Sequence, residues 1–380
     1  MKFSPIEEQL MGELIELAAQ KRGMTAPNPM VAAGIVKDGR LIASAVHEAA
    51  GFDHAEVALF KQVLPQDLKG ATLMVTLEPC THHGKTPPCV DQVLKSGVSE
   101  VIVATLDPNP LVKRSPAADS LNAAGITYRW GCLWEKAVQL NAVYLTNQIE
   151  SRAFLAIKIA SSLDGKVALS NGKSQYLTGE KSLKRVHQLR AEYAAICVGI
   201  YTVIADQPQL TIRHGINAHR VPYIMVIDPM FRYLEWGGSL HKHHDAAHLI
   251  LIGKSSGLTT QKRSDLSKVA TLWEYPDQGF LDTKRFLSDC LARGIESVFC
   301  EGGPGTWTAF LDSGFVDRYY QFIAPKLIRS QAAKSLFQSA DYESLDELTL
   351  LDLLTVETLD SDILVDAYLK SPLRFQSELL

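Results

Sequence analysis

Hydrophobic residues recur along the chain with two different periods, and their alternation predicts a layered α/β protein. Near the N-terminus Leu10, Leu14 and Leu17 repeat at helical spacing, which predicts an amphipathic helix over Glu7–Gln20. Apolar runs bounded by turn residues predict strands over Val31–Val36, Leu41–Val46, Ala71–Leu77 and Glu100–Leu106. Further helices are expected over His54–Leu64, Cys89–Lys95 and Ala117–Ala124. This alternation indicates an α/β sandwich in the first half.

The second half starts the alternation again. Strands are predicted over Phe154–Ile159, Ile196–Ile200, Tyr223–Ile227, Leu249–Gly253 and Ser297–Cys300. Helices are predicted over Glu180–Tyr193, Thr283–Arg293 and Thr306–Asp312. The amphipathic segment Trp134–Glu150 is the expected connection, and the histidine-rich stretch Gly237–His248 is expected to be an exposed loop. Two domains follow, over residues 1–150 and 151–380.

Composition narrows the class of protein. The chain has 380 residues, 46% of them hydrophobic and 21% charged, as is typical of soluble globular proteins. No apolar run is long enough to cross a bilayer, and the N-terminus has no secretory signal, so a cytoplasmic location is expected. The net charge of −4 argues against nucleic-acid binding. Cys132, Cys197, Cys290 and Cys300 lie in apolar stretches and are expected to be buried thiols.

Two other cysteines and one histidine suggest a catalytic zinc site. A catalytic zinc takes three protein ligands and keeps a position for water, and His54, Cys80 and Cys89 fit that count. Glu56 lies two residues after the histidine, where a carboxylate can move protons between the water and a departing amine. A structural zinc site completed by His82 or His83 is the alternative.

The residues around these ligands resemble the RibD family of riboflavin biosynthesis, in which a pyrimidine deaminase is fused to an NADPH-dependent reductase. The segment from Glu78 to Cys89, EPCTHHGKTPPC, reproduces the family's cysteine-containing loop. Thr25–Pro29 and Asp107–Pro110 are two further family signatures. The resemblance runs over nearly the whole chain. It implies a cytidine-deaminase-like three-layer sandwich followed by a dihydrofolate-reductase-like α/β domain.

The resemblance also implies roles for individual residues in the first half. His54, Cys80 and Cys89 would bind zinc, and Glu56 would transfer protons. The pyrimidine would be held by Asn28, His47, His82, Lys85 and Asn109. Lys85 is a point cation on a tight loop, which suits a phosphate-bearing substrate, and asparagine amides can both donate to and accept from a pyrimidine edge. Each asparagine taken alone could equally be a turn-former beside proline.

In the second half the resemblance rests on five segments. They are Lys158–Gly165, Ser174–Tyr176, Thr202–Asp206, Leu210–Arg213 and Glu301–Gly305. By position, NADPH would be lined by Ala160, Tyr176, Thr202, Asp206, Gly303, Pro304, Gly305 and Thr306. The substrate would be held by Ser174, Arg190, Leu210, Arg213 and Glu301. Lys158 would lie near the ribose that is reduced. The substrate would be oriented for reduction by Lys158, Asp206 and Glu301. Arginines such as Arg190 and Arg213 suit phosphate.

The residues of the second half carry weaker signals by themselves. A strand, then Glu301–Gly305, then a helix could place a phosphate on a helix N-terminus, but the same pattern is also a common tight turn. The cluster of His241, His243, His244 and His248 could bind metal, although a solvated loop is favoured.

Several positions depart from the family pattern. Lys113-Arg114-Ser115-Pro116 stands where the family has two glycines, so this loop is expected to differ in shape. Pro229 replaces a Ser or Thr that would help to hold the cofactor, Tyr176 replaces a Trp, and Arg329 replaces a Gly. The reductase half is therefore the less typical one.

The resemblance therefore implies a bifunctional zinc hydrolase and NADPH-dependent oxidoreductase. The expected substrate is a phosphoribosylated 2,5-diaminopyrimidinone, which would be deaminated and then reduced at its ribosyl group to ribityl. A deaminase with a catalytically impaired reductase-like domain is the first alternative. A nucleic-acid base deaminase and a zinc-stabilised interaction protein are two others. A homo-oligomer is possible, and neither a nucleic-acid nor a membrane partner is expected.

Overall fold

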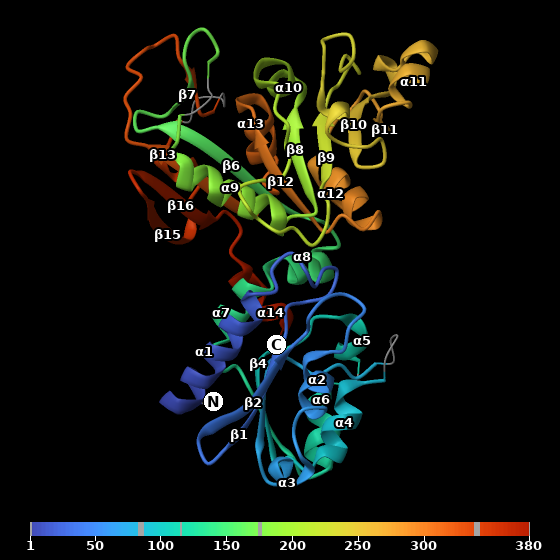
Figure 1. Ribbon diagram of the computed structural model, residues 1–380, viewed down its shortest axis with the longest axis vertical. Coiled ribbons are helices and arrows are strands. Elements are labelled where there is room, and N and C mark those ends of the chain that lie inside the picture. Colours follow the sequence, from blue (N-terminus) through green and yellow to red (C-terminus); the bar gives the residue numbers. More distant parts are fainter. Residues whose placement is uncertain (1, 83–86, 115, 174–176, 338–342, 380) are drawn as a thin grey trace. The chain divides into compact units, whose positions relative to one another are not determined.

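The chain folds into two compact units, which are described separately. The structure is a computed structural model that describes residues 2–82, 87–114, 116–173, 177–337 and 343–379 (Figure 1). The first unit consists of Met1–Ser151 with Pro372–Leu380, and the second of Arg152–Ser371. The chain therefore passes into the second unit after residue 151 and returns to the first at residue 372.

The first unit is built on one five-stranded sheet. Its strands are β1 (Ala32–Lys37), β2 (Arg40–Val46), β3 (Thr72–Leu77), β4 (Glu100–Thr105) and β5 (Thr127–Trp130), in the order β2-β1-β3-β4-β5. β1 runs antiparallel to β2 and β3, whereas β3, β4 and β5 are parallel. The carboxyl ends of β3 and β4 consequently lie at the same edge of the sheet.

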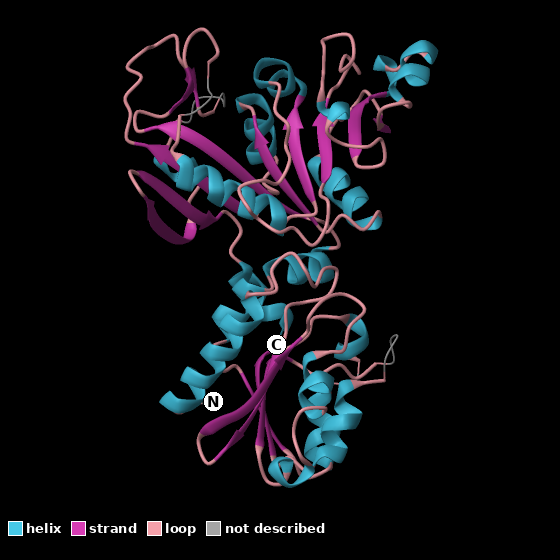
Figure 2. Cartoon of the chain, in the orientation of Figure 1, coloured by secondary structure: helices cyan, strands magenta, loops and turns pink. Residues whose placement is uncertain are grey.

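Helices cover both faces of this sheet (Figure 2). They are α1 (Pro5–Ala19), α2 (Ala55–Phe60), α3 (Pro65–Leu68), α4 (Cys89–Ser96), α5 (Pro110–Lys113), α6 (Ala117–Ala123), α7 (Trp134–Leu140) and α8 (Ala142–Glu150). Alternate strand residues point to opposite faces. Met74 and Ile102 pack with α1 and α7, whereas Leu73 and Val101 pack with α2, α4 and α6. The predicted three-layer sandwich is confirmed.

One predicted helix of this unit ends earlier than expected, and the predicted connecting segment is divided into two helices. The helix expected over His54–Leu64 ends at Phe60, and a short helix begins separately at Pro65. The segment Trp134–Glu150 is broken at Asn141, where α7 ends and α8 begins. The Asn141 side chain accepts from the Met30 N–H at 2.8 Å and donates to the Met30 carbonyl at 2.9 Å. An asparagine that bonds backbone elsewhere in this way favours a helix end over a helix interior.

The second unit has a nine-stranded sheet in the order β11-β10-β9-β8-β12-β6-β13-β16-β15. Its strands are β6 (Phe154–Ser162), β8 (Ala195–Gly199), β9 (Tyr223–Ile227), β10 (Leu249–Lys254), β11 (Thr271–Tyr275), β12 (Ser297–Gly302), β13 (Arg318–Ala324), β15 (Asp352–Leu359) and β16 (Asp362–Tyr368). The strands are parallel from β11 through β13, and β16 and β15 follow antiparallel. A separate two-stranded sheet pairs β7 (Lys166–Ala168) with β14 (Lys334–Ser335).

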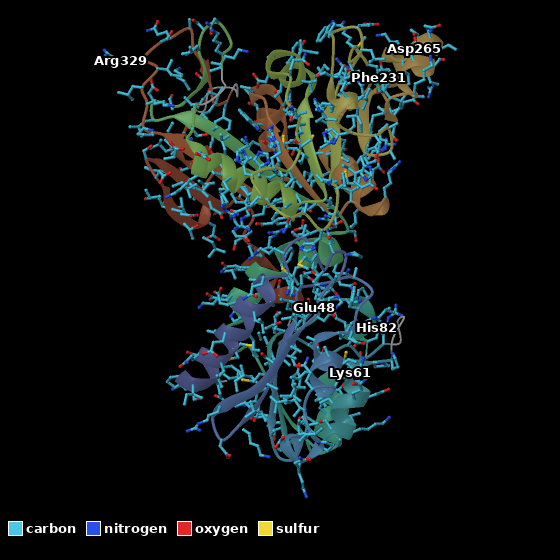
Figure 3. All side chains as sticks on the ribbon, in the orientation of Figure 1. Glu48, Lys61, His82, Phe231, Asp265 and Arg329 are labelled. Atoms are coloured by element: carbon cyan, nitrogen blue, oxygen red, sulfur yellow. The ribbon has the colours of Figure 1, made fainter. Side chains whose placement is uncertain are left out.

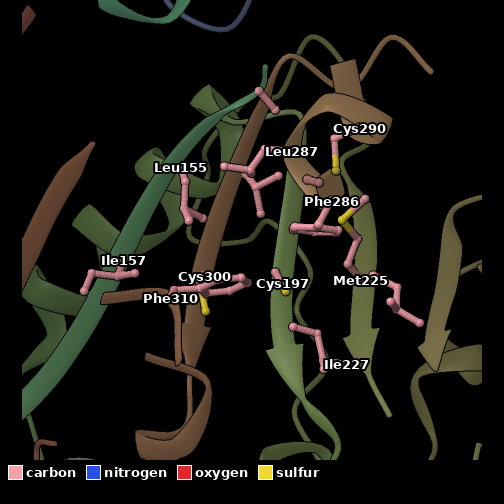
Figure 4. Close-up of a cluster of buried hydrophobic side chains, with 14 of the residues drawn as sticks. Leu155, Ile157, Cys197, Met225, Ile227, Phe286, Leu287, Cys290, Cys300 and Phe310 are labelled. Atoms are coloured by element: carbon pink, nitrogen blue, oxygen red, sulfur yellow. The ribbon is translucent and has the colours of Figure 1, made fainter. Parts of the chain in front are cut away.

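The helices of the second unit also lie on both faces of its sheet. They are α9 (Glu180–Glu192), α10 (Ile200–Asp206), α11 (Thr260–Leu266), α12 (Thr283–Ala292) and α13 (Pro304–Asp312), with short 3₁₀ turns η1 (Leu240–Lys242), η2 (Ser255–Gly257) and η3 (Leu345–Glu347). Phe286 of α12 and Phe310 of α13 pack on Leu155, Cys197 and Cys300 of the strands (Figure 4). The opposite face packs Ile196 and Val226 against Val203 of α10 and Leu266 of α11.

The fold shows where the predicted exposed loop and the four predicted buried thiols lie. The stretch Gly237–His248 contains η1, and Leu240 within it is fully buried, so it is only in part the exposed loop that was expected. The four cysteines expected to be buried thiols are confirmed as buried and free. Among the described residues, none of the helices combines the length and apolar character that crossing a membrane requires.

A buried ion pair in the second unit lies between the first residues of this unit and its last ones. The Arg152 guanidinium donates two bonds of 2.7 Å to the Asp317 carboxylate, and both side chains are almost completely buried. The same carboxylate accepts from the Leu155 N–H at 2.9 Å. The Asp317 carbonyl accepts from the Leu369 N–H, also at 2.9 Å. The start of β6 and the end of β16 are thus joined through one residue.

The division of the structure into two units differs from the predicted domains at the C-terminal end. The second domain was expected to extend to residue 380, whereas η4 (Pro372–Phe375) and α14 (Gln376–Leu379) belong to the first unit. Phe375 and Leu379 are buried in an apolar cluster with Leu77, Val138 and Leu145 of the first unit. Burial of these two side chains explains why residues 372–379 pack with the first unit and not with the sheet of the second.

The Arg152–Asp317 pair provides a test of this arrangement. We expect Arg152→Met to lower the unfolding free energy of the second unit by about 3 kcal/mol, because the Asp317 carboxylate stays buried without its counter-charge. The measurement is denaturant-dependent hydrogen exchange of peptides from β6 and β13. Arg263→Met is the matched control, because it removes an equally bidentate but exposed partner of Glu274 and should change little. Equal effects of the two substitutions would contradict the structural role of Asp317.

Candidate functional site

Three potential metal ligands converge in the first unit. His54 Nδ1 lies 3.2 Å from Cys89 Sγ and 3.6 Å from Cys80 Sγ, and the three ligand atoms all lie within 4.8 Å of one another. Among the described residues, this is the only group of three or more such side chains close enough to hold one metal ion. The structure therefore brings together the three zinc ligands that the sequence predicts.

Local structure places each donor at the end of an element. His54 is the N-cap of α2, Cys80 follows β3 after two residues, and Cys89 is the first residue of α4. The Cys89 N–H points to Cys80 Sγ at 3.3 Å. Hydrogen bonding from Cys89, and then from His54, lowers the pKa of Cys80. Cys80 thus favours thiolate, the form that binds metal, whereas the hydrogen bond with Cys80 and burial raise the pKa of Cys89.

The donor set fits zinc well. One imidazole nitrogen and two thiolates are ligands that zinc prefers, and three protein ligands leave one position for water. A structural site would need a fourth protein ligand, and the described residues supply none within the cluster. His83, one of the two histidines that could complete a structural site, lies outside the described residues.

Glu56 lies directly beside the donor cluster. It stands in the first turn of α2 and is 3% exposed. Burial, followed by the charge of Cys80, raises the pKa of Glu56 to about 7. A carboxyl group with such a pKa can both accept and donate a proton near neutral pH.

A chain of hydrogen bonds fixes the orientation of Asn28. His47 Nδ1 lies 2.9 Å from the Asp53 carbonyl, which can only accept, so Nδ1 carries the hydrogen. His47 Nε2 must then accept, and it lies 3.1 Å from Asn28 Nδ2. The Asn28 NH2 group is therefore engaged by His47, and its carbonyl oxygen is the group that Asn28 can offer to a ligand as an acceptor. Burial lowers the pKa of His47, in agreement with a neutral ring.

Asn109 is oriented in the opposite sense. Its Oδ1 accepts from the Leu111 N–H at 3.0 Å and caps α5, so the turn-forming interpretation is correct for this oxygen. The Asn109 N–H donates to Asp107 Oδ1 at 2.9 Å. The Tyr144 hydroxyl donates to the same oxygen at 2.9 Å. Asn109 thus has its NH2 group as the donor that it can present.

Glu78 is a positioning residue that the sequence interpretation missed. Its carboxylate is buried and accepts from the Asp107 N–H at 3.2 Å and from the Ala117 N–H at 3.0 Å. These two donors lie at the two ends of the loop that carries Asn109. Glu78 therefore closes this loop in spite of the missing family glycines. The signal available in the sequence was its position directly before Pro79-Cys80.

Two predicted substrate residues lie on the loop between the cysteines. His82 is half-buried on the loop that follows β3 (Figure 3), and its Nδ1 has no hydrogen-bond partner among the described residues. A buried nitrogen of this kind suits a polar ligand. Lys85 lies outside the described residues.

In the second unit, three predicted residues form one buried ion cluster. Glu301 at the end of β12 accepts from Arg190 of α9 through both guanidinium Nε and Nη2, the latter at 2.9 Å. Lys158 Nζ of β6 lies 3.2 Å from Glu301 Oε2. Burial would raise the pKa of Glu301, but the charges of Arg190 and Lys158 outweigh it and lower the pKa to about 2. Glu301 is therefore ionised at any physiological pH.

His187 holds the segment that carries Leu210 and Arg213, and sequence reasoning missed it. Its Nδ1 accepts from the Arg213 N–H at 3.0 Å, while Arg190 Nη1 donates to the Thr211 carbonyl at 3.0 Å. Burial, and then the charge of Arg190, lowers the pKa of His187 to about 4, so the ring is a neutral acceptor. The signal was its i, i+3 spacing from Arg190 on α9.

Glycines at the carboxyl ends of β8 and β12 bring two helix N-termini close together. A Cβ on Gly199 would lie 2.5 Å from Thr306 Oγ1, and a Cβ on Gly303 would lie 2.8 Å from Thr202 Oγ1. Gly199 precedes α10 and Gly303 precedes α13. Only glycine permits this approach, and the paired N-termini with two hydroxyls suit a phosphate group. Of the predicted cofactor residues, Gly303 therefore lies beside Thr202, and Thr306 lies beside Gly199.

The remaining predicted residues have mixed outcomes. Ala160 lies on β6, two residues after Lys158. Asp206 is the last residue of α10. Leu210 is buried and has a positive φ of 51°. Ser174 and Tyr176 lie outside the described residues, so their expected roles stay predictions.

Arg329 retains the backbone shape of the glycine that it replaces. Its φ of 54° lies in the left-handed region that glycine favours. The Asp164 carboxylate accepts from the Arg329 N–H at 2.8 Å and from the Ile328 N–H at 3.0 Å, which holds this loop in place. Pro229 is another position that departs from the family pattern. Its carbonyl accepts from the Lys254 N–H at 2.9 Å.

Comparison with known proteins covers both units. Residues 5–105 match the cytidine and deoxycytidylate deaminase zinc-binding region, and residues 153–365 match the RibD C-terminal domain. The riboflavin biosynthesis protein RibD of Aquifex aeolicus is 38% identical, over 85% of this chain and 88% of its own length. The Escherichia coli RibD is 34% identical, over 86% and 89% of the two chains.

Solved structures agree with these relatives. Acinetobacter baumannii RibD is 34% identical with a TM-score of 0.81, and the match covers 96% of this chain and 98% of that one. A Thermotoga maritima diaminohydroxyphosphoribosylaminopyrimidine deaminase and 5-amino-6-(5-phosphoribosylamino)uracil reductase is 32% identical, with the same TM-score and coverage. The predicted fold class is confirmed for both units. The alternative of an impaired reductase-like domain is not favoured, because the relatives match over both halves.

The family models match both domains, and the relatives are more than 30% identical over most of the chain. These matches establish the family of the protein. The chain is a member of the RibD family, a bifunctional enzyme of riboflavin biosynthesis that joins a zinc-binding deaminase domain to a reductase domain.

Proposed function

We propose that the first unit deaminates a phosphoribosylated diaminopyrimidinone and that the second reduces the product's ribosyl group with NADPH. The observation that carries the deaminase assignment is the position of the buried Glu56 carboxyl beside the His54, Cys80 and Cys89 donors. The name of the Thermotoga maritima relative, 32% identical to this chain, describes the same pair of reactions.

In the deaminase site, zinc bound by the three donors would polarise a water molecule for attack on the amine-bearing carbon. Glu56 takes a proton from the attacking water and delivers it to the departing nitrogen. The carbon gains an oxygen and loses ammonia, so atoms and charge balance. Because Glu56 is buried beside the donors, bulk water does not compete for the proton.

Two asparagines would read the pyrimidine. Asn28 has its carbonyl oxygen to offer, because its NH2 group is engaged by His47. Asn109 has its NH2 group to offer, because its oxygen caps α5. One acceptor and one donor match a ring edge that bears both an N–H and a carbonyl. His82 would contact the substrate from the loop between the cysteines, and Lys85 is proposed to bind its phosphate.

In the reductase site, NADPH would supply hydride to C1′ of the ribosyl group in its open imine form, and the nitrogen takes a proton. The glycine-lined helix N-termini with Thr202 and Thr306 would hold a phosphate of the cofactor. Lys158 and Arg190 are held by Glu301 at one point, and we propose that they orient the substrate. Arg213, Leu210, Asp206 and Ala160 would line the same site, with Ser174 and Tyr176 from the segment that is not described.

Two further expectations remain proposals. A cytoplasmic location is the expectation from the sequence, and cell fractionation would test it. A homo-oligomer is also possible, and the mass of the protein in solution would measure it.

The first test concerns Glu56. We expect Glu56→Gln to lower the rate of ammonia release by at least about a thousandfold, because the amide cannot transfer the proton. Zinc content should not change, since Glu56 is not a ligand. Ammonia release and bound zinc are measured on the same preparation, with Glu48→Gln as an exposed control. Substantial deamination by Glu56→Gln would contradict the role of this carboxyl group.

The second test concerns the reductant. NADPH absorbance should decrease only when the deaminated intermediate is present, because the reductase acts on the product of the first reaction. NADH is compared at the same concentration, together with NADPH and the substrate in the absence of zinc. Oxidation of NADPH with the undeaminated substrate by a zinc-free enzyme would contradict the proposed order.

The third test uses the pKa of Glu301. A pKa of about 2 in the fold, below the ordinary value of 4.5, means that the ionised carboxylate stabilises the fold above about pH 4.5. That stabilisation, about 3 kcal/mol, is lost as pH falls from there towards 2. We expect Glu301→Gln to destabilise the second unit by a similar amount near neutral pH, and the difference from wild type to narrow below about pH 4.5. Hydrogen exchange of β12 peptides measures it, and a pH-independent difference would contradict the ion cluster.

A further inference from the structure

The last eight described residues, 372–379, follow the reductase strands in sequence but pack with the deaminase unit. They form η4 and α14. Phe375 and Leu379 are 3% and 5% exposed, so they are as deeply buried as core residues. The match to the RibD C-terminal domain ends at residue 365, before this segment begins.

Phe375 and Leu379 complete an apolar cluster that contains the body of Tyr144. The other buried members are Leu77 of β3, Val138 of α7 and Leu145 of α8. Leu77 directly precedes Glu78-Pro79-Cys80, the segment that leads to the metal ligand. The C-terminal segment is thus packed on side chains that lead into the deaminase site from two directions.

Tyr144 connects this cluster to the substrate loop. Its ring lies in the cluster, and its hydroxyl donates to Asp107 Oδ1 at 2.9 Å. The same carboxylate oxygen accepts the Asn109 N–H at 2.9 Å. The position of the Tyr144 ring therefore determines where Asn109 is held.

A second contact reaches the same loop. The Lys113 ammonium, at the end of α5, donates to the Glu378 carbonyl of α14. Asn109 is the N-cap of α5, so both ends of this short helix are held by groups that depend on the C-terminal segment. At the other end of the segment, Arg374 Nε donates to Glu150 Oε1 of α8 at 3.0 Å. The segment is therefore fixed at three points within the first unit.

We propose that residues 372–379 are a positioning element of the deaminase site, which holds Tyr144 and α5 so that Asn109 faces the pyrimidine. This inference rests on the proposed role of Asn109. The four-residue helix α5 ends at Lys113, at the start of the stretch Lys113-Arg114-Ser115-Pro116 that lacks the family's two glycines. Lys113 makes the contact with α14, so the loop that departs from the family pattern is joined to the C-terminal segment.

The test compares chains that differ only in this segment. A chain ending at Ser371 should show a roughly ten- to hundredfold higher KM for deamination, because Asn109 is no longer held in place. Phe375→Ala and Tyr144→Phe should raise the same KM, while Phe375→Leu restores part of the effect of Phe375→Ala. Bound zinc and NADPH-dependent reduction of the deaminated intermediate should not change in any of them. Gln376→Ala, an exposed position beside Phe375, is the matched control.

The outcomes separate this inference from the proposed function. Failure of the wild-type enzyme to deaminate the pyrimidine would contradict the proposed substrate. Equal KM and kcat in the wild-type and shortened chains would overturn the role of the segment. If the shortened chain does not fold, as shown by loss of zinc and of reductase activity, Tyr144→Phe decides instead. That variant keeps the ring in the cluster and removes only the hydroxyl, so an unchanged KM would also overturn the proposal.

Discussion

Two helices of the first unit begin at the point where β3 ends, and the deaminase chemistry depends on this convergence. The N-cap of α2 is His54 and the first residue of α4 is Cys89, while Cys80 follows β3 after two residues. Parallel strands with helices between them place such ends at one edge of a sheet. Backbone N–H groups at a helix start also favour thiolate. Fold and electrostatics therefore act together to assemble a zinc site from residues far apart in sequence.

The same geometry recurs in the second unit with different chemistry. β8 and β12 are neighbouring parallel strands, and each leads into a helix through glycine. The charged group at this edge is Glu301, whose carboxylate is balanced by Arg190 and Lys158. Burial of an unbalanced carboxylate would be strongly unfavourable, so the three residues form one unit in structural terms. An anionic substrate can approach because the cluster has one more positive charge than negative.

Motif residues were predictable from the sequence, whereas the residues that hold them were not. His54, Cys80, Cys89 and Glu56 follow from ligand chemistry and spacing, whereas the role of Glu301 was implied by the resemblance to the family. Glu78, Tyr144 and His187 act through contacts with residues distant in sequence, for which a single chain gives no periodic signal. The break at Asn141 arises from a tertiary hydrogen-bond pair with Met30 that overrides helical periodicity. The return of residues 372–379 depends on a cluster drawn from three separate elements, which no local pattern reveals.

The central claim is that two reactions occur in sequence on one molecule, with water supplying an oxygen and NADPH supplying a hydride. The most direct measurement is mass analysis of products formed in oxygen-18 water, with and without NADPH deuterated at its transferable position. The account predicts one heavy oxygen on the pyrimidine in both reactions, and one deuterium on the ribityl C1′ only when NADPH is present. Deuterium in a product that retains its amine, or a deaminated product without heavy oxygen, would contradict it.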